Sequence, residues 1–238
     1  MTLIIRAVGD GVDFSSNALG GVLTSLRAGL IGEYVFGGSL SASLENWANA
    51  DLPMTAIGSP TIGSNYADLG AAGFATGLFE SADITMIGIG YGTEANFTSM
   101  VTNFKGSNAA TSSGIFLHPG NDLLYLQAHS TDNTNQNITL ALAQPDSAYR
   151  FQAGRISAGT NYAQELDQYI GGVHTFNHQV IAKTRVGNST DQLKISTGFT
   201  AAVRMAGALI YNRALSDAEL LQVYEEVSSA LAVRGVTV

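Results

Sequence analysis

The stretch ALIYNRALSDAELLQVYEE, residues 208–226, joins a strand-like segment to a marked helix start within a chain of 238 residues. Ser216 followed three residues later by Glu219 has the pattern of a capping box, in which each side chain bonds the other residue's amide. Leu215 and Leu220 flank this cap as a hydrophobic staple. The sequence therefore predicts a helix that begins after Ser216.

The helix has one apolar face. Its members recur at helical spacing over about four turns, and they are Leu220, Val223, Val227 and Leu231. Gly235 is a plausible stop signal. These features predict a C-terminal helix that packs on a core.

The segment before the helix, VRMAGALIY at 203–211, alternates as a strand. The pattern predicts two faces, one with Met205, Gly207, Leu209 and Tyr211 and the other with Ala206, Ala208 and Ile210. With a single charged residue, this strand is expected to be buried.

A strand, then YNRALSDAE at 211–219, then a short helix resembles the C-terminal signature of the laminin-G-like, or concanavalin A-like, lectin and glucanase superfamily. Three upstream segments are similar to other core strands of that superfamily: RVGNSTDQLKISTGFTAAVRMAGALIY (185–211), SADITMIGIGYG (81–92) and GIFLHPGNDLLYLQAH (114–129). The resemblance covers residues 30–226. It implies an all-β fold, a two-sheet antiparallel jelly-roll sandwich with a short C-terminal helix.

Composition agrees with one β-rich domain. The chain has 27 glycines and 13% charged residues, which suits short strands joined by tight turns. Strands are expected at 84–91, 114–118, 123–129, from 138, and at 149–156, 180–186 and 192–196. Pro119 and Gly120 fit the centre of a type II turn between two of them.

We expect residues 1–28 to form an N-terminal arm and residues 29–238 to form the jelly-roll domain. Apolar side chains in the arm need to be covered, among them Leu3, Ile4, Ile5, Val8 and Phe14. The arm is expected to anchor the protein or to join identical chains. We expect a homo-oligomer, most plausibly a trimer.

Several functions are disfavoured. The chain has no cysteine, which removes disulfides and cysteine-based metal sites. A net charge of −8 argues against a nucleic-acid partner, and no apolar run is long enough for membrane insertion. Acidic residues dominate between Arg27 and Lys105 and basic residues from Arg150 to Arg213, so the two regions could face each other within a protomer or across subunits, or lie scattered on the surface.

Catalysis is not expected. The enzymes of this superfamily carry Glu-x-Asp on a strand and a second glutamate four or five residues after the first. QELDQYIGG supplies Glu165 and Asp167, but Tyr169 and Ile170 hold the second position. Without that acid/base residue, retaining hydrolysis lacks its proton donor. The i, i+4 pair His174 and His178 would chelate a metal only on a helix, and its surroundings indicate loop or strand.

Candidate sugar sites need an exposed aromatic ring beside amides and carboxylates. Two groups meet this description in the sequence: Trp47 with Asn46 and Asn49, and Tyr162 with Asn161 and Gln164. The alternative for each ring is a place in the core or at its rim.

The resemblance implies calcium as a candidate cofactor, because related lectin-like domains often hold it through loop oxygens. Four residues offer hard oxygen ligands: Asn121, Asp122, Asp132 and Asn133. The alternative is that they are turn residues whose side chains bond the local backbone.

The resemblance leads us to expect a non-catalytic structural or host-surface-binding protein of a bacteriophage particle, on a tail, fibre or capsid. Because the N-terminal sequence lacks the apolar core of a signal peptide, assembly into the virion inside the host cytoplasm is expected. The expected partners are other virion proteins and host surface glycans. A free carbohydrate-binding lectin is the alternative, and a polysaccharide-cleaving enzyme is the second alternative.

Overall fold

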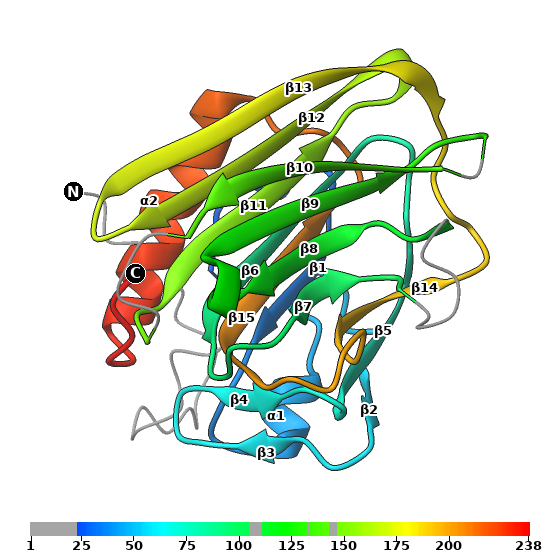
Figure 1. Cartoon of the computed structure of the whole chain (residues 1–238). Coiled ribbons are helices and arrows are strands. Elements are labelled where there is room, and N and C mark those ends of the chain that lie inside the picture. Colours follow the sequence, from blue (N-terminus) through cyan, green and yellow to red (C-terminus); the bar gives the residue numbers. More distant parts are fainter. Residues whose placement is uncertain (1–22, 105–110, 133, 143–146) are drawn as a thin grey trace.

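The computed structural model describes residues 23–104, 111–132, 134–142 and 147–238. Two antiparallel sheets pack face to face, and one long helix near the C-terminus lies on the outer face of the larger sheet (Figure 1). The predicted all-β sandwich with a C-terminal helix is confirmed. The predicted arm residues Leu3, Ile4, Ile5, Val8 and Phe14 lie outside the described residues.

The larger sheet, called sheet A, has eight strands. Their order is β13 (Val173–Arg185), β12 (Gly159–Ile170), β11 (Arg150–Ile156), β6 (Ile84–Gly92), β15 (Val203–Tyr211), β4 (Ala67–Leu69) and β3 (Thr61–Ile62), and β1 (Leu30–Val35) also pairs with β15. The long strand β13 therefore forms one edge of the sheet, as Figure 1 shows.

The smaller sheet, sheet B, has seven strands. Their order is β10 (Asn135–Ala141), β9 (Leu123–His129), β8 (Gly114–His118), β7 (Thr98–Thr102), β14 (Gln192–Ser196), β5 (Gly73–Phe79) and β2 (Thr55–Ile57). A short helix, α1 (Leu40–Leu44), follows β1. Strands β8, β9 and β14 have the limits that the sequence predicts.

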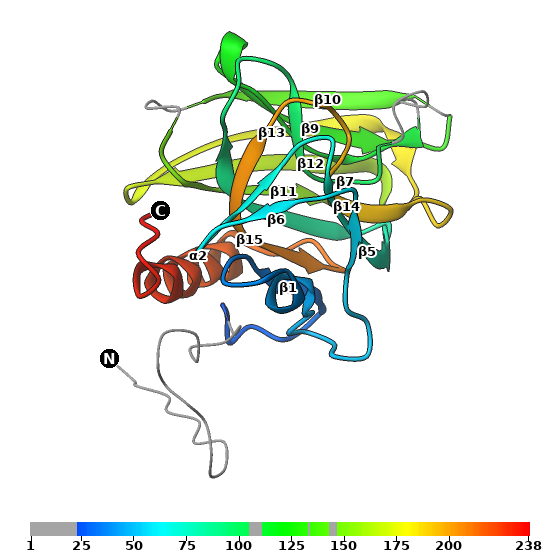
Figure 2. The same cartoon turned by 90° about the horizontal axis from the view of Figure 1, so that it is seen from below.

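Two apolar cores hold the layers together. The first fills the space between the sheets and includes Phe74, Leu126 and Ile210. The second lies between the outer face of sheet A and the C-terminal helix α2 (Asp217–Ala232). Figure 2 shows this helix lying against the sheet. Burial of these side chains supplies the main stabilising free energy of the fold.

The cap of α2 forms as predicted. The hydroxyl of Ser216 accepts from the amide of Glu219, whose carboxylate accepts from the amide of Ser216 at 2.9 Å. Arg213 donates to the same carboxylate at 2.9 Å, and this bond leads the causes that lower the pKa of Glu219 to about 2. The stabilising effect of the ionised carboxylate is thus present at neutral pH and is lost only as the pH falls through this lowered value.

The two faces of β15 differ from the prediction. Met205 joins Ala208 and Ile210 in the core between the sheets, while Ala206 joins Leu209 and Tyr211 beneath α2. The register with β6 shifts between Met205 and Gly207. A bulge of this kind reverses the alternation beyond it, so the prediction that Met205 shares a face with Leu209 was wrong.

The turn between β8 and β9 also differs. Pro119–Asn121 form a 3-10 helix, and Asp122 rather than Gly120 takes the left-handed conformation, with φ of 52°. A type II turn needs positive φ at Gly120, so that prediction was wrong. Glycine is required there for another reason, since a Cβ would lie 2.4 Å from the carbonyl oxygen of Ala95.

A long hairpin connects β12 and β13, where the sequence predicted only a strand at 180–186. Gly171 and Gly172 form its two-residue turn with φ of 55° and 82°, the conformation of a type I′ turn. The hairpin consists of the two longest strands of sheet A. It carries the candidate site.

Acidic and basic regions of the sequence meet within one chain. Arg204 makes two bonds of 2.7 Å to Asp68, and Arg185 pairs with Glu80 where neither side chain is exposed. These contacts confirm the intramolecular form of the charge hypothesis for two pairs.

Residues 23–28, assigned to the arm by sequence, lie on the domain. Leu23 is buried in the core beneath α2. Glu33 accepts from the amide of Leu23 and pairs with Arg27, and Glu226 accepts from Thr24 and Ser25. Two carboxylates therefore fasten this segment to β1 and α2.

Candidate functional site

Strands β11, β12 and β13 lie side by side next to the start of α2, with β11 buried and residues 173–180 of β13 exposed. Their pairing aligns side chains in rows across the outer face of sheet A: Arg155–Glu165–His178, Ala153–Asp167–Phe176 and Phe151–Tyr169–His174. Neighbours within a row on adjacent strands lie about 5 Å apart at Cβ. The rows thus bring titratable and aromatic side chains together.

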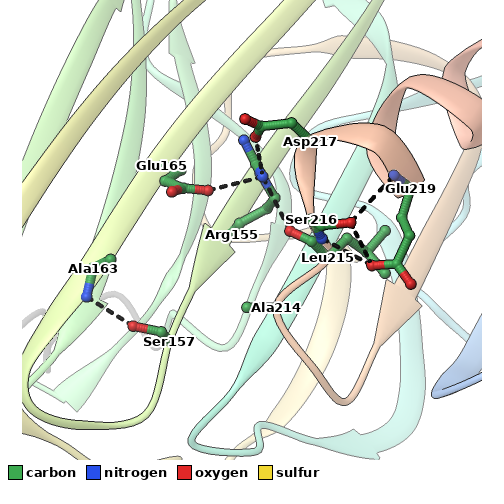
Figure 3. A pocket seen from close by; sticks show the side chains of 9 residues that line it. All are labelled: Arg155, Ser157, Ala163, Glu165, Ala214, Leu215, Ser216, Asp217 and Glu219. Carbon is green, nitrogen blue, oxygen red and sulfur yellow. Dashed lines mark hydrogen bonds and ion pairs between the residues drawn. The ribbon is translucent and has the colours of Figure 1, made fainter.

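Arg155 is the centre of the site. Its Nε donates to Oδ2 of Asp167 at 3.0 Å, and its Nη2 donates to Oδ1 of the same residue at 3.2 Å. Its Nη1 lies 2.8 Å from Oε2 of Glu165 and 2.7 Å from Oδ1 of Asp217, which come from β12 and α2 (Figure 3). Nη1 also donates to the carbonyl of Leu215 at 3.0 Å. The guanidinium therefore joins the hairpin to the helix start.

The cluster around Arg155 carries more negative than positive charge. Burial lowers the pKa of Arg155, but the charge of Asp167 and bonds to the carboxylates outweigh it and hold the pKa above its ordinary value. Three carboxylates surround this one guanidinium. The cluster is therefore net negative.

A surface pocket of about 420 Å³ opens beside the guanidinium. Its two sides both carry carboxylate or hydroxyl side chains, as Figure 3 shows, with β11 and β12 opposite the first turn of α2. The lining residues are Arg155, Ser157, Ala163, Glu165, Ala214, Leu215, Ser216, Asp217 and Glu219. Carboxylates and hydroxyls of this kind are suited to bonding the hydroxyls of a sugar.

An aromatic stack borders the cluster. The ring of His174 stacks on Tyr169 with centroids 4.2 Å apart and on Phe176 at 5.4 Å, and Tyr224 of α2 stacks on the other side of Tyr169 at 4.2 Å. Nε2 of His174 bonds Oδ1 of Asp167 at 3.0 Å. Phe176 ends the stack and is 65% exposed, so it presents an apolar ring directly across from Asp167.

The carboxylates are not arranged as a retaining hydrolase requires. In such enzymes two carboxyl groups flank the bond that is cleaved. Here Nη1 of Arg155 contacts both Glu165 and Asp217 and so occupies the space between them. A bond to be cleaved cannot lie between these two carboxylates while both ion pairs to Arg155 hold.

Trp47 meets one requirement of the first sugar site predicted from sequence. It is 37% exposed. Asn46 is buried, because its amide bonds the backbone of Ile31 and Glu33. Asn49 is exposed, and its side-chain oxygen accepts from the amide of Asp51 in a local turn. Of the two side-chain amides, that of Asn46 is thus already used in hydrogen bonds to the backbone of the domain.

Tyr162 does not present the exposed ring that the second prediction requires. The ring is fully buried, and its hydroxyl bonds Ser130 at 2.9 Å. Gln164 is also buried and donates to the carbonyl of Gln136 on the edge strand β10 at 2.9 Å. Asn161 is exposed with φ of 60° at a register shift in β12. These residues hold the two sheets together at one edge.

The predicted calcium ligands do not come together. Asn121 and Asp122 precede β9 and Asp132 follows it, and seven residues of strand span about 20 Å. Asp132 instead pairs with Lys183 at 3.0 Å and accepts from Thr134, while Asn133 lies outside the described residues. A single site of these four residues is contradicted by this separation.

His174 and His178 lie on an extended strand, as the sequence indicated, and each faces a different carboxylate. Within the described part of the chain, no group of three or more histidine, aspartate or glutamate side chains is placed to hold a metal ion. None of the helices described here combines the length and apolar character needed to cross a membrane.

No protein-family model matches the sequence, and no curated protein matches it. Among solved structures, the botulinum neurotoxin serotype D binding domain is similar, with a TM-score of 0.57 and 11% identity over 84% of this chain and 51% of that one. The botulinum neurotoxin type G receptor binding domain has a TM-score of 0.56 and 10% identity over 87% and 52%. The Ruminococcus gnavus IT-sialidase CBM40 bound to alpha2,3 sialyllactose has a TM-score of 0.44 and 16% identity over 61% and 83%.

The chain spans about half the length of the neurotoxin domains that it matches. At these identities the likeness concerns the fold. It agrees with the two-sheet sandwich described above, and the chain has a jelly-roll fold.

Proposed function

We propose that this domain is a non-catalytic carbohydrate-binding module whose site is the outer face of β12 and β13 beside the start of α2. The observation that carries the proposal is the position of Phe176, a 65% exposed ring across from Asp167 and diagonal to Glu165. A sugar can stack its apolar face on such a ring while its hydroxyls donate to Glu165, whose side chain is 32% exposed.

Three further features support this proposal. The pocket beside Arg155 has room for part of an oligosaccharide, and its lining includes carboxylate and hydroxyl side chains beside apolar ones. The site lies on paired strands and a capped helix, so its geometry is fixed before binding. The fold is compatible with a binding role, since similar domains are described as binding domains and one of them is in complex with SialylT.

Replacing Phe176 with alanine tests the proposal. We expect the affinity for the oligosaccharide to fall at least about tenfold, a loss of about 1.4 kcal/mol, because the stacking surface is removed. The thermal midpoint should barely move, since the ring is mostly in water. A glycan array, followed by calorimetry with cellohexaose and an N-acetylglucosamine hexamer, provides the measurement.

Phe79→Ala is the matched control. Phe79 is also an exposed phenylalanine on a strand, at 49%, but it lies on β5 of sheet B. Its replacement should leave binding unchanged. Equal losses in the two variants, or no binding of any glycan by the natural chain, would refute the proposed site.

For the setting of this module we propose a bacteriophage particle, in which the chain forms a homo-oligomer, a trimer, joined through its N-terminal segment. The support is the sequence resemblance, the absence of cysteine and the apolar residues before Leu23. Light scattering should give a trimer for the full chain and a monomer for a chain that begins at Leu23. The chain should also co-sediment with purified particles, and its presence in the soluble fraction alone would contradict this setting.

A further inference from the structure

We infer that the site on β12 and β13 selects sugars that carry a free amino group and rejects sugars that carry a carboxylate. This inference rests on the proposed carbohydrate-binding function and adds the charge class of the ligand. Three observations lead to it: the hydrogen bonds that Arg155 already makes within the protein, the free carboxylate oxygens at the pocket, and the charges around those oxygens.

Arg155 is not available to a ligand. Each of its guanidinium nitrogens already bonds a protein oxygen, with Nε and Nη2 on Asp167 and Nη1 on Asp217 and the carbonyl of Leu215. Its side chain is only 6% exposed. A ligand carboxylate that entered the pocket would therefore meet the surrounding carboxylates before any cation, and like charges repel at this range.

The carboxylates themselves are available. Asp217 is 89% exposed and uses Oδ1 for Arg155, and among the described residues its Oδ2 has no hydrogen-bond partner. Glu165 uses Oε2 for Arg155, and its Oε1 lies 3.9 Å from Nε2 of His178, which is longer than a hydrogen bond. An ammonium group carries three donors and no acceptor. Its charge-assisted bonds to these oxygens would be stronger than those of a neutral hydroxyl.

Nearby charges do not reverse this preference. Arg213, the other cation close to the pocket, is bonded to Glu219 of the lining at 2.9 Å. His174 is bonded to Asp167, and His178 faces Glu165. The whole chain has a net charge of −8, so the long-range field also attracts cations.

Calorimetry with two hexamers of matched backbone and one anionic oligosaccharide tests the inference. The probes are a glucosamine hexamer with free amines, its N-acetylated counterpart, and a galacturonate hexamer as the anionic probe. At about pH 6, where a sugar amine is charged, we expect the free-amine hexamer to bind at least about tenfold more tightly than the N-acetylated one, with still weaker binding of galacturonate. Raising the salt from about 0.05 to about 0.5 M should reduce the preference several-fold.

Asp217→Asn and Glu165→Gln should each weaken binding of the free-amine hexamer at least about fivefold more than binding of the N-acetylated hexamer, so that most of the preference for the amine is lost. Because Asp217 is so exposed, its variant is expected to fold normally. Glu225→Gln removes the same charge from an exposed position further along α2 and should retain the preference.

The outcomes separate the two proposals. If the galacturonate hexamer binds as tightly as the others, or if the free-amine hexamer shows no advantage, the charge selectivity is overturned while the binding function stands. If Phe176→Ala has no effect on any of the three probes, or none of them binds, the proposed site itself fails.

Discussion

Replacing Arg155 with methionine is expected to destabilise the domain by about 3–5 kcal/mol, because it leaves a buried carboxylate without its counter-charge. Asp167 is 1% exposed and receives two bonds from this guanidinium. Glu165 and Asp217 would also repel each other once the cation between them is gone. For a domain of this size the thermal midpoint should fall by roughly 6–20 °C, and sugar binding should be lost with the geometry of the pocket. Differential scanning calorimetry measures the first effect.

Arg204→Met provides the comparison. Arg204 also makes two bonds to an aspartate, Asp68, but both side chains of that pair are partly in water. Its guanidinium lies 3.8 Å from the centre of the Tyr66 ring, so its removal should cost about 1–2 kcal/mol in total. A loss for Arg155→Met that is no greater than this would contradict the central role given to Arg155.

The parts of the fold that could be predicted are those in which one local signal decides the structure. The cap at Ser216 marks the start of α2. The turn residues at 119–122, which lie between two apolar segments, mark the end of β8 and the start of β9. Strand β13 had no such signal, because residues 173–180 are exposed on both faces and carry no apolar alternation. The Gly171–Gly172 pair before it was the usable indication, since two consecutive glycines between strand-like segments suit a type I′ turn.

The site was harder to predict because its members are distant in the chain. The spacing of Glu165 and Asp167 is visible in the sequence. Arg155, however, is separated from Asp217 by 62 positions, and no local pattern links these two residues. Tyr162 shows the opposite difficulty. An aromatic residue between amides gives the same sequence pattern whether its ring lies in a sugar site or in a core. Only the register of β12 places the ring of Tyr162 inside.

The buried pair of Glu80 and Arg185 shows that charge also holds the two sheets together away from the site. Neither side chain is exposed. Glu80 follows β5 and accepts from Asn103 after β7 at 2.7 Å, while Arg185 ends β13 and donates to the carbonyl of His129 at 2.9 Å. One ion pair therefore connects strand ends of sheet A and sheet B.

Arg185→Met is expected to cost about 3–5 kcal/mol, and Glu80→Met a similar amount, because each leaves its partner charged and buried. This is a large share of a total stability of about 5–15 kcal/mol. The double variant should be less destabilised than the two single losses combined, with a coupling energy of about 1–3 kcal/mol, since it removes both charges together. The double variant should still be less stable to unfolding than the natural chain, because the hydrogen bonds to Asn103 and to the carbonyl of His129 are lost as well. Urea unfolding of the four proteins gives the cycle, and strictly additive losses would show that the two charges do not stabilise each other.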